Sequence, residues 1–208
     1  MLGRNILDNL RRREPTESLI CAESHYENGL HFAHQRLYIR AMEEFKQAIR
    51  VKPDYAEAQF ELGVTYQKLG RPNEAIKPYL AALEIQPDLV NAYKNLGLAY
   101  DSQGHFLKAL KMYLRAIRLD PDDVELRNDL GVAYFNIGSY AEAIKAYQQA
   151  LQIDPNNGRA HYCLGLVHLD LDDKESALEE QSTLERLNQD ELATQLHDEI
   201  DRQRLRSS

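Results

Sequence analysis

The feature that most constrains the fold of this chain is an internal repeat with a period of 34 residues. Segments 62–87, 96–121 and 130–155 place the same residue types in the same order. A fixed period of this size is typical of a solenoid, in which each repeat packs against its neighbours. Three small or rigid residue types recur at this spacing: Pro53, Pro87, Pro121 and Pro155; Gly29, Gly63, Gly97, Gly131 and Gly165; and Ala41, Ala75, Ala109, Ala143 and Ala177.

Each repeat has the apolar spacing of two helices. Leu62, Tyr66 and Leu69 follow one another at i, i+4 and i+7, and the second half of the repeat has the same pattern. Gly70 lies between the two halves, where a left-handed residue allows a helix to end and the chain to turn. Pro87 then ends the second helix. The sequence therefore predicts a helix, a tight turn and a second helix in every repeat.

The glycines inside the predicted first helices indicate close packing. Glycine within a helix costs about 1 kcal/mol relative to alanine, so a repeated glycine needs a structural reason. We expect a second helix to approach too closely for a side chain, with the alanines of the second helices, such as Ala75, facing the glycines. Asp54 and Asp122 are predicted to be N-caps, and Pro78 is predicted to kink its helix.

The pattern of leucine-glycine, tyrosine, glycine, alanine, aromatic, alanine and proline closely resembles the tetratricopeptide repeat. Residues 56–155 match nearly column for column. The match extends to 22–55, where Arg36 replaces the turn glycine. It weakens over 158–189, where Gln181 and Gln189 replace an aromatic residue and the proline. The resemblance implies an all-α, right-handed superhelix of helical hairpins.

This resemblance also implies a domain organisation. We expect an N-terminal amphipathic basic segment at 1–15 and a repeat array at 16–189. A capping helix and tail follow at 190–208, where Leu192, Leu196 and Ile200 line one helical face. The expected repeats span about 22–55, 56–89, 90–123, 124–157 and a degenerate 158–189.

Composition excludes several classes of function. The net charge of −8 argues against general nucleic-acid binding, and no apolar run is long enough to cross a membrane. The first residues lack the features of a secretory signal, and only Cys21 and Cys163 are present, so a cytoplasmic location is expected. Residues 1–119 carry 17 Lys and Arg against 14 Asp and Glu, whereas 120–208 carry 8 against 19. Salt-sensitive association of copies through opposite charges is therefore a hypothesis.

No motif points to catalysis or to a cofactor. The chain lacks a phosphate-binding loop, a dinucleotide-binding glycine motif, a CxxC pair and a recognisable catalytic triad. His31 and His34 could share a helical face, but no third metal ligand has a suitable spacing. We expect neither an enzyme nor a metal site.

What remains is a surface for binding. In the family that the chain resembles, the first helices line a concave groove, so the resemblance implies a peptide or helix of a partner there. The implied contact residues are Glu57, Phe60, Glu61, Val64, Lys94, Asn95, Leu98, Glu125, Asn128, Asp129, Val132, Phe135, Tyr162 and Leu166. Tyr26, Leu30, Asp101, Leu169 and Asp170 extend this surface, and Lys68 and Arg159 are the other cations near it. A partner with apolar anchors and basic residues would suit an apolar, acid-rimmed groove.

Several alternatives remain open at this stage. The apolar residues of this surface could simply pack the first helices against one another; they are Leu30, Val64, Leu98, Val132 and Leu166. The repeats also resemble the substrate-recruiting array of O-GlcNAc transferase-type enzymes, and a self-assembling scaffold is a third hypothesis. Of the residues that clamp chaperone tails in one subgroup of the family, only Asn95 has a match here, so we reject that ligand. Leu2, Ile6 and Leu10, together with the arginines of 1–13, could dock on a membrane surface, on a partner or on the first repeat.

Overall fold

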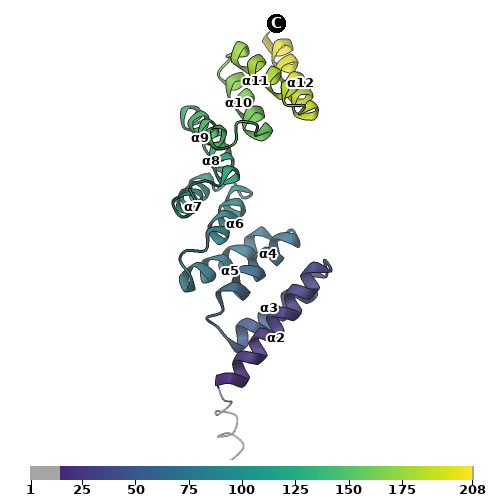
Figure 1. Ribbon diagram of the computed structural model, residues 1–208, viewed down its shortest axis with the longest axis vertical. Coiled ribbons are helices and arrows are strands. Elements are labelled where there is room, and N and C mark those ends of the chain that lie inside the picture. Colours follow the sequence, from purple (N-terminus) through teal and green to yellow (C-terminus); the bar gives the residue numbers. More distant parts are fainter. Residues whose placement is uncertain (1–14, 208) are drawn as a thin grey trace, which may run out of the picture. The chain divides into compact units, whose positions relative to one another are not determined.

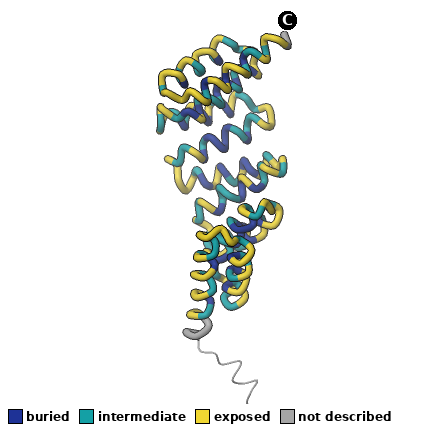
Figure 2. The backbone as a smooth tube through the Cα atoms, turned by 90° about the vertical axis from the view of Figure 1, so that its right-hand side faces the viewer, coloured by how far each residue is buried: buried dark blue, intermediate teal, exposed yellow. Residues whose placement is uncertain are grey.

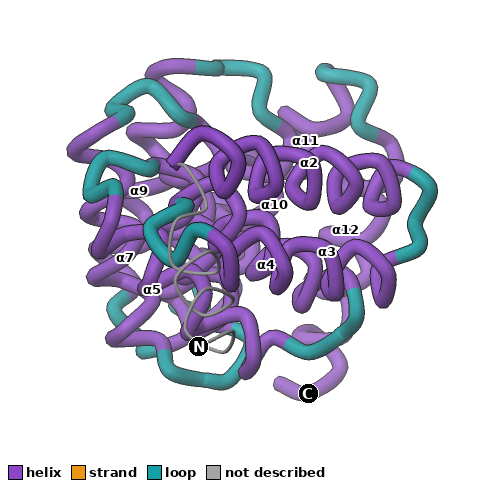
Figure 3. The backbone as a smooth tube through the Cα atoms, turned by 90° about the horizontal axis from the view of Figure 1, so that it is seen from below, coloured by secondary structure: helices purple, strands orange, loops and turns teal. Residues whose placement is uncertain are grey.

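A computed structural model describes residues 15–207, and in this part of the chain every regular element is an α-helix (Figures 1 and 3). The chain divides into two compact units after Gln103, and each is described by itself. Unit 1 contains α2 (Pro15–His34), α3 (Tyr38–Val51), α4 (Ala56–Lys68), α5 (Pro72–Ile85) and α6 (Val90–Asp101). Unit 2 contains α7 (Phe106–Leu119), α8 (Val124–Asn136), α9 (Tyr140–Ile153), α10 (Gly158–Asp170), α11 (Lys174–Arg186) and α12 (Asp190–Ser207).

Consecutive helices pack as hairpins. In unit 1, α2 packs on α3 and α4 packs on α5; in unit 2, α8 packs on α9 and α10 packs on α11. Each helix buries one side and exposes the other, so dark blue and yellow alternate along the chain in Figure 2. The predicted all-α fold of helical hairpins with a C-terminal capping helix is confirmed. The basic segment predicted at 1–15 lies, except for Pro15, outside the described residues.

The recurring glycines face aromatic rings, which corrects the prediction that they face alanines. A Cβ atom on Gly29 would lie 2.5 Å from Cε1 of Phe45, and one on Gly63 would lie 2.5 Å from Cε1 of Tyr79. The ring of Tyr147 covers Gly131 in the same way. Each glycine therefore makes room for a fully buried ring from the second helix of its own hairpin.

The last hairpin replaces this ring with a side chain from the capping helix. Gln181 stands where an aromatic residue is expected, and a Cβ atom on Gly165 would instead lie 2.5 Å from Cδ2 of Leu196. Leu196 and Ile200 of α12 are fully buried beside Leu184 of α11. The capping helix thus fills the space that the missing aromatic residue leaves open.

The turns between paired helices have left-handed backbone. Gly70, Gly104 and Gly138 have φ between 70° and 74°. Arg36 has φ 59°, so it adopts the conformation of the turn glycine that it replaces, at the usual cost of a non-glycine residue in this region. After the first turn glycine, the N–H of Arg71 donates to the carbonyl of Tyr66 over 2.9 Å and closes the helix end.

The predicted N-caps are wrong by one residue. Tyr55, and not Asp54, precedes α4, and its side chain makes no capping hydrogen bond. In unit 2 the carboxylate of Asp123, and not that of Asp122, accepts from the N–H of Leu126 over 3.0 Å. Pro53 and Asp54 form the turn before α4, and Pro121 and Asp122 form the turn before α8, so each cap position falls one residue later than predicted. The helix α5 continues through Pro78 from Pro72 to Ile85.

Candidate functional site

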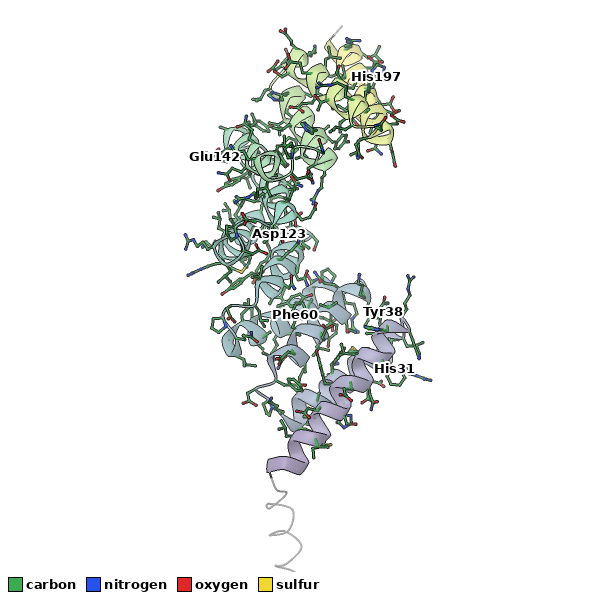
Figure 4. The ribbon with its side chains drawn as sticks, viewed as in Figure 1. His31, Tyr38, Phe60, Asp123, Glu142 and His197 are labelled. Carbon is green, nitrogen blue, oxygen red and sulfur yellow. The ribbon has the colours of Figure 1, made fainter. Side chains whose placement is uncertain are left out.

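In unit 1 the predicted contact residues lie on α4 and α6. Phe60, labelled in Figure 4, is half-buried, and its ring centroid lies 5.8 Å from that of the buried Tyr79. Val64 is half-buried and Leu98 is 37% exposed. Phe60 therefore has an internal partner that the sequence did not indicate, and part of its ring remains accessible to a ligand.

Two tyrosines of unit 1 form a tilted aromatic pair, with 40° between the ring planes. The ring centroids of Tyr26 in α2 and Tyr55 before α4 lie 5.0 Å apart. Burial, followed by the charge of Glu61, raises the pKa of the Tyr26 hydroxyl to about 12. Burial also raises the pKa of Tyr55, and so do three neighbouring carboxylates. We call this surface the acid–tyrosine face; its residues are Glu23, Tyr26, Glu27, Tyr55, Glu57 and Glu61.

Glu61 is the most enclosed acid of the acid–tyrosine face. Burial raises the pKa of its carboxyl group, an effect that His34 partly offsets. Neither Glu57 nor Glu61 forms an ion pair with another residue in the described part of the chain. The ammonium of Lys52 lies 4.5 Å from the centroid of the Tyr55 ring, so this face already holds one cation over an aromatic ring.

In unit 2 the acids of α8 are neutralised within the chain. One guanidinium nitrogen of Arg159 donates to Glu125 over 2.7 Å, and another donates to Asp129 over 2.7 Å. Burial lowers the pKa of Arg159, but the hydrogen bonds to these carboxylates raise it overall. The expectation that both acids give unit 2 a free negative surface is therefore wrong, because Arg159 from α10 occupies them.

Asn128 belongs to the interior and not to a ligand surface. Its side chain is fully buried, and its amide nitrogen donates to the Asn157 side chain over 3.0 Å. The same Asn157 oxygen accepts from the N–H of Ala160 as the N-cap of α10. Asp129 is likewise buried, with 7% of its side chain exposed. Both residues join α8 to α10, which corrects their predicted role in binding a partner.

Phe135 and Leu166 are brought together at a pocket of about 190 Å³ in unit 2. The Phe135 ring centroid lies 5.7 Å from that of Tyr140, whose hydroxyl donates to Asp170 over 3.2 Å. Arg202 of α12 lines the same pocket, so the capping helix also forms part of this surface. Val132 and Tyr162 are half-buried nearby, on α8 and α10.

Three residues of the acid–tyrosine face were not among the contact residues predicted from the sequence. Glu23 and Glu27 lie one period before Glu57 and Glu61, so the 34-residue spacing could have found them. Tyr55 lies in a loop outside the repeated columns, and only the structure places it beside Tyr26. Lys94 and Asn95 are half-buried on α6, and the Asn95 carbonyl accepts from the Gln67 side chain over 3.2 Å.

Two histidines pair with acids inside the hairpins. His25 lies 2.7 Å from Glu44, and His161 lies 2.6 Å from Glu180, each nitrogen facing a carboxylate oxygen. The two pairs occupy equivalent repeat positions four periods apart. No group of three or more potential metal ligands occurs among the described residues. No helix of residues 15–207 is both long enough and apolar enough to cross a membrane.

Comparison with known families agrees with this architecture. Models described as the tetratricopeptide repeat match residues 94–158 and 138–200, and a model described as the TPR repeat matches 38–70 and 68–104. Together these matches run from residue 38 to residue 200. The chain belongs to the tetratricopeptide repeat family. No curated protein matches its sequence significantly.

Solved structures of similar fold include other tetratricopeptide repeat proteins. A crystal structure of MamA is 23% identical, with a TM-score of 0.78 over 81% of this chain and 92% of that one. A MamA fragment from Desulfovibrio magneticus RS-1 is 21% identical, with a TM-score of 0.78 over 81% and 96%. YrrB, described as having an unusual peptide-binding site, is 22% identical, with a TM-score of 0.75 over 84% and 90%. At this level of identity the likeness concerns the fold.

Proposed function

We propose that this tetratricopeptide repeat protein is a non-catalytic interaction module. Its acid–tyrosine face in unit 1 would bind a segment of a partner protein in which arginine or lysine side chains alternate with apolar anchors. The proposal rests on a contrast between two equivalent pairs of acids, one of which has an arginine and one of which does not.

The pair that has an arginine is in unit 2. Arg159 holds Glu125 and Asp129 with one hydrogen bond to each carboxylate. Glu57 and Glu61 are the equivalent residues two periods earlier, and the position equivalent to Arg159 is Asn91, an exposed residue of α6. The acids of α4 therefore have the arrangement that accepts a guanidinium in unit 2, but the neighbouring helix supplies none. This observation carries the proposal, because an arginine from a partner would complete the same geometry.

The surroundings of these acids suit the rest of such a segment. The rings of Tyr26 and Tyr55 offer aromatic faces on which a second cation could rest, as Lys52 does on Tyr55. Phe60 and Val64 are half-buried and offer partly exposed apolar surface to an anchor side chain. Phe135 and Leu166 remain proposed as an apolar contact surface of unit 2 by itself.

The comparisons favour a peptide as the ligand. YrrB shares the fold and is described as having a peptide-binding site. Extended or helical peptides bind such grooves by inserting side chains at regular intervals, with charges setting orientation and association rate. A partner segment with leucines and arginines on one side would meet both the apolar and the acidic parts of the acid–tyrosine face.

Calorimetric titration tests this proposal with designed probes. The probes are synthetic helical peptides that carry leucines at i, i+4 and i+7 with arginines between them, and counterparts in which glutamate replaces every arginine. We expect the arginine peptides alone to bind. Changing Glu57→Gln and Glu61→Gln together should weaken binding about tenfold or more, equivalent to about 1.4 kcal/mol.

Glu125→Gln is the matched control, because that glutamate holds the same repeat position but already pairs with Arg159. The affinity of this variant for the arginine peptides should stay within about twofold of the wild-type affinity, which is a change in binding free energy below about 0.5 kcal/mol. Equal binding of arginine and glutamate peptides, or full affinity in the double variant with unchanged helical content, would place the ligand surface elsewhere.

A further inference from the structure

A pocket of about 460 Å³ lies in unit 1 between α3, α4 and α5. Its wall includes Ile49 and Leu62, which are apolar, together with Lys46, Gln59, Lys77 and Ala81. Advancing one residue turns a helix by about 100°, so Gln59 and Leu62 lie on the side of α4 opposite Glu57 and Glu61. The pocket is therefore separate from the acid–tyrosine face, and its volume lies within the range of known ligand sites, about 300–1,000 Å³.

One side-chain contact that spans the equivalent space in unit 2 is absent from this repeat. In unit 2 the residues equivalent to Gln59 and Ala81 are Arg127 and Gln149, and the Arg127 guanidinium donates to the Gln149 side chain over 3.3 Å. This contact spans the equivalent space between α8 and α9. Ala81 has no side chain beyond Cβ, so the space beside Gln59 stays open.

The equivalent of the His–Glu pair is also absent here. Gln59 and Pro78 occupy the positions that hold His25 with Glu44 in the first hairpin. Proline has no side-chain acceptor and no N–H, so it neither binds Gln59 nor donates to the carbonyl of Glu74 one turn earlier. Both Glu74 and Pro78 line the pocket. The helix α5 thus lacks one backbone hydrogen bond next to the pocket.

The charged groups at the pocket are mainly positive. The ammonium of Lys46 lies 5.5 Å from the centroid of the Tyr66 ring, and the guanidinium carbon of Arg71 lies 5.2 Å from it. Arg71 is occupied by two hydrogen bonds to the carboxylate of Glu74. Lys46 and Lys77 are exposed, and in the described part of the chain neither forms an ion pair with a carboxylate. Two lysines are therefore available at the rim of an apolar pocket.

We propose that this pocket binds a second type of partner segment, in which one large apolar side chain enters the pocket and flanking aspartate or glutamate residues pair with Lys46 and Lys77. The apolar walls of Ile49, Leu62 and Ala81 accept the side chain, and the charge at the rim selects acidic neighbours. The ligand chemistry is the opposite of that proposed for the acid–tyrosine face. One chain would thus bind a basic segment and an acidic segment on opposite sides of α4.

The test uses an array of synthetic peptides, each with Phe, Trp or Leu between acidic residues, and matched peptides in which lysine replaces every acid. The acidic peptide that binds most tightly is then titrated by fluorescence polarisation into the full chain and its variants. Ala81→Gln introduces the residue that fills the equivalent space in unit 2, and Lys77→Glu reverses a charge at the rim. Each change should weaken binding about tenfold or more.

Lys145→Glu is the matched control, because Lys145 is the exposed residue two periods after Lys77. This change should leave the affinity for the acidic peptide unchanged. Circular dichroism checks that each variant keeps its helical content. The proposal is overturned if acidic peptides bind no better than their lysine counterparts, or if Ala81→Gln and Lys77→Glu bind like the wild type. Light scattering without peptide tests the alternative that a second copy of the chain fills the pocket. A dimer that Ala81→Gln disrupts would show that a second copy, and not an acidic segment, is the occupant.

Discussion

Gly63 in α4 has no room for a methyl group, because a Cβ atom would lie 2.5 Å from the ring of Tyr79. Helix propensity alone favours alanine over glycine by about 1 kcal/mol. We nevertheless expect Gly63→Ala to lower the free energy of unfolding by about 1–3 kcal/mol, since the buried ring must move. Urea unfolding followed by circular dichroism measures this. Asn73→Ala, at an exposed helical residue, is the control. A Gly63→Ala variant more stable than the wild type would contradict the close packing of Tyr79 against Gly63.

The pair of His161 and Glu180 predicts a pH-dependent stability. The hydrogen bond to Glu180 raises the pKa of His161 in the folded protein. The stabilisation from this pair is therefore complete below the unfolded pKa of about 6.5, and it is lost as the pH rises through the higher folded pKa. Glu180→Gln should cost most stability near pH 5 and progressively less toward pH 8.

Urea unfolding at a series of pH values checks this dependence. Glu179→Gln, at an exposed neighbouring position, is the control and should show no such trend. A cost of Glu180→Gln that stayed constant or grew with pH would show that the pair does not stabilise the charged histidine.

The partner of Gly63 could not be predicted from the sequence. The period of 34 residues showed that Gly63 needs a close neighbour, but Ala75 and Tyr79 recur with the same period on the second helix. Periodicity alone cannot decide which of them faces the glycine, because the two lie only about one turn apart. The offset of one helix along the other decides it, and that offset depends on the packing of whole side chains.

At the scale of helices, α12 completes the last hairpin through Leu196. This side chain is fully buried and covers Gly165 in place of an aromatic ring. Leu196→Ala should lower the free energy of unfolding by about 2–5 kcal/mol, as is usual when a buried leucine is truncated. Leu107→Ala, at a leucine that is 67% exposed, is the control. Equal effects of the two changes in thermal unfolding would contradict the role of α12 as the cap.

The helices were predictable from the sequence, and the contacts between neighbouring hairpins were not. Apolar spacing, turn glycines and prolines fix where each helix lies along the chain, because these signals are local. Arg159 binds Glu125 and Asp129 across two first helices, and Phe60 rests on Tyr79. Such contacts depend on the offset between packed helices, so a surface that looked uniformly acidic in sequence is partly neutralised in the structure.

For the molecule as a whole, the uneven charge predicts association of copies at low salt. Residues 1–119 carry an excess of basic residues and 120–208 a large excess of acidic ones. A contact between unlike surfaces of two copies does not close on itself and can extend into larger assemblies. Light scattering should report a higher mass at about 0.01 M than at about 1 M salt, where the screening length falls from about 30 Å to about 3 Å. A monomer at high protein concentration in low salt would refute this.

The measurement that bears most directly on the central claim is a titration of the variant Asn91→Arg. Asn91 occupies in α6 the repeat position that Arg159 occupies in α10. If Glu57 and Glu61 form an acceptor for a partner's arginine, the new side chain should bind them from within and displace the ligand. We expect the variant to lose at least about tenfold in affinity for the arginine peptides while its helical content is unchanged. Binding of these peptides to Asn91→Arg with wild-type affinity would contradict the claim.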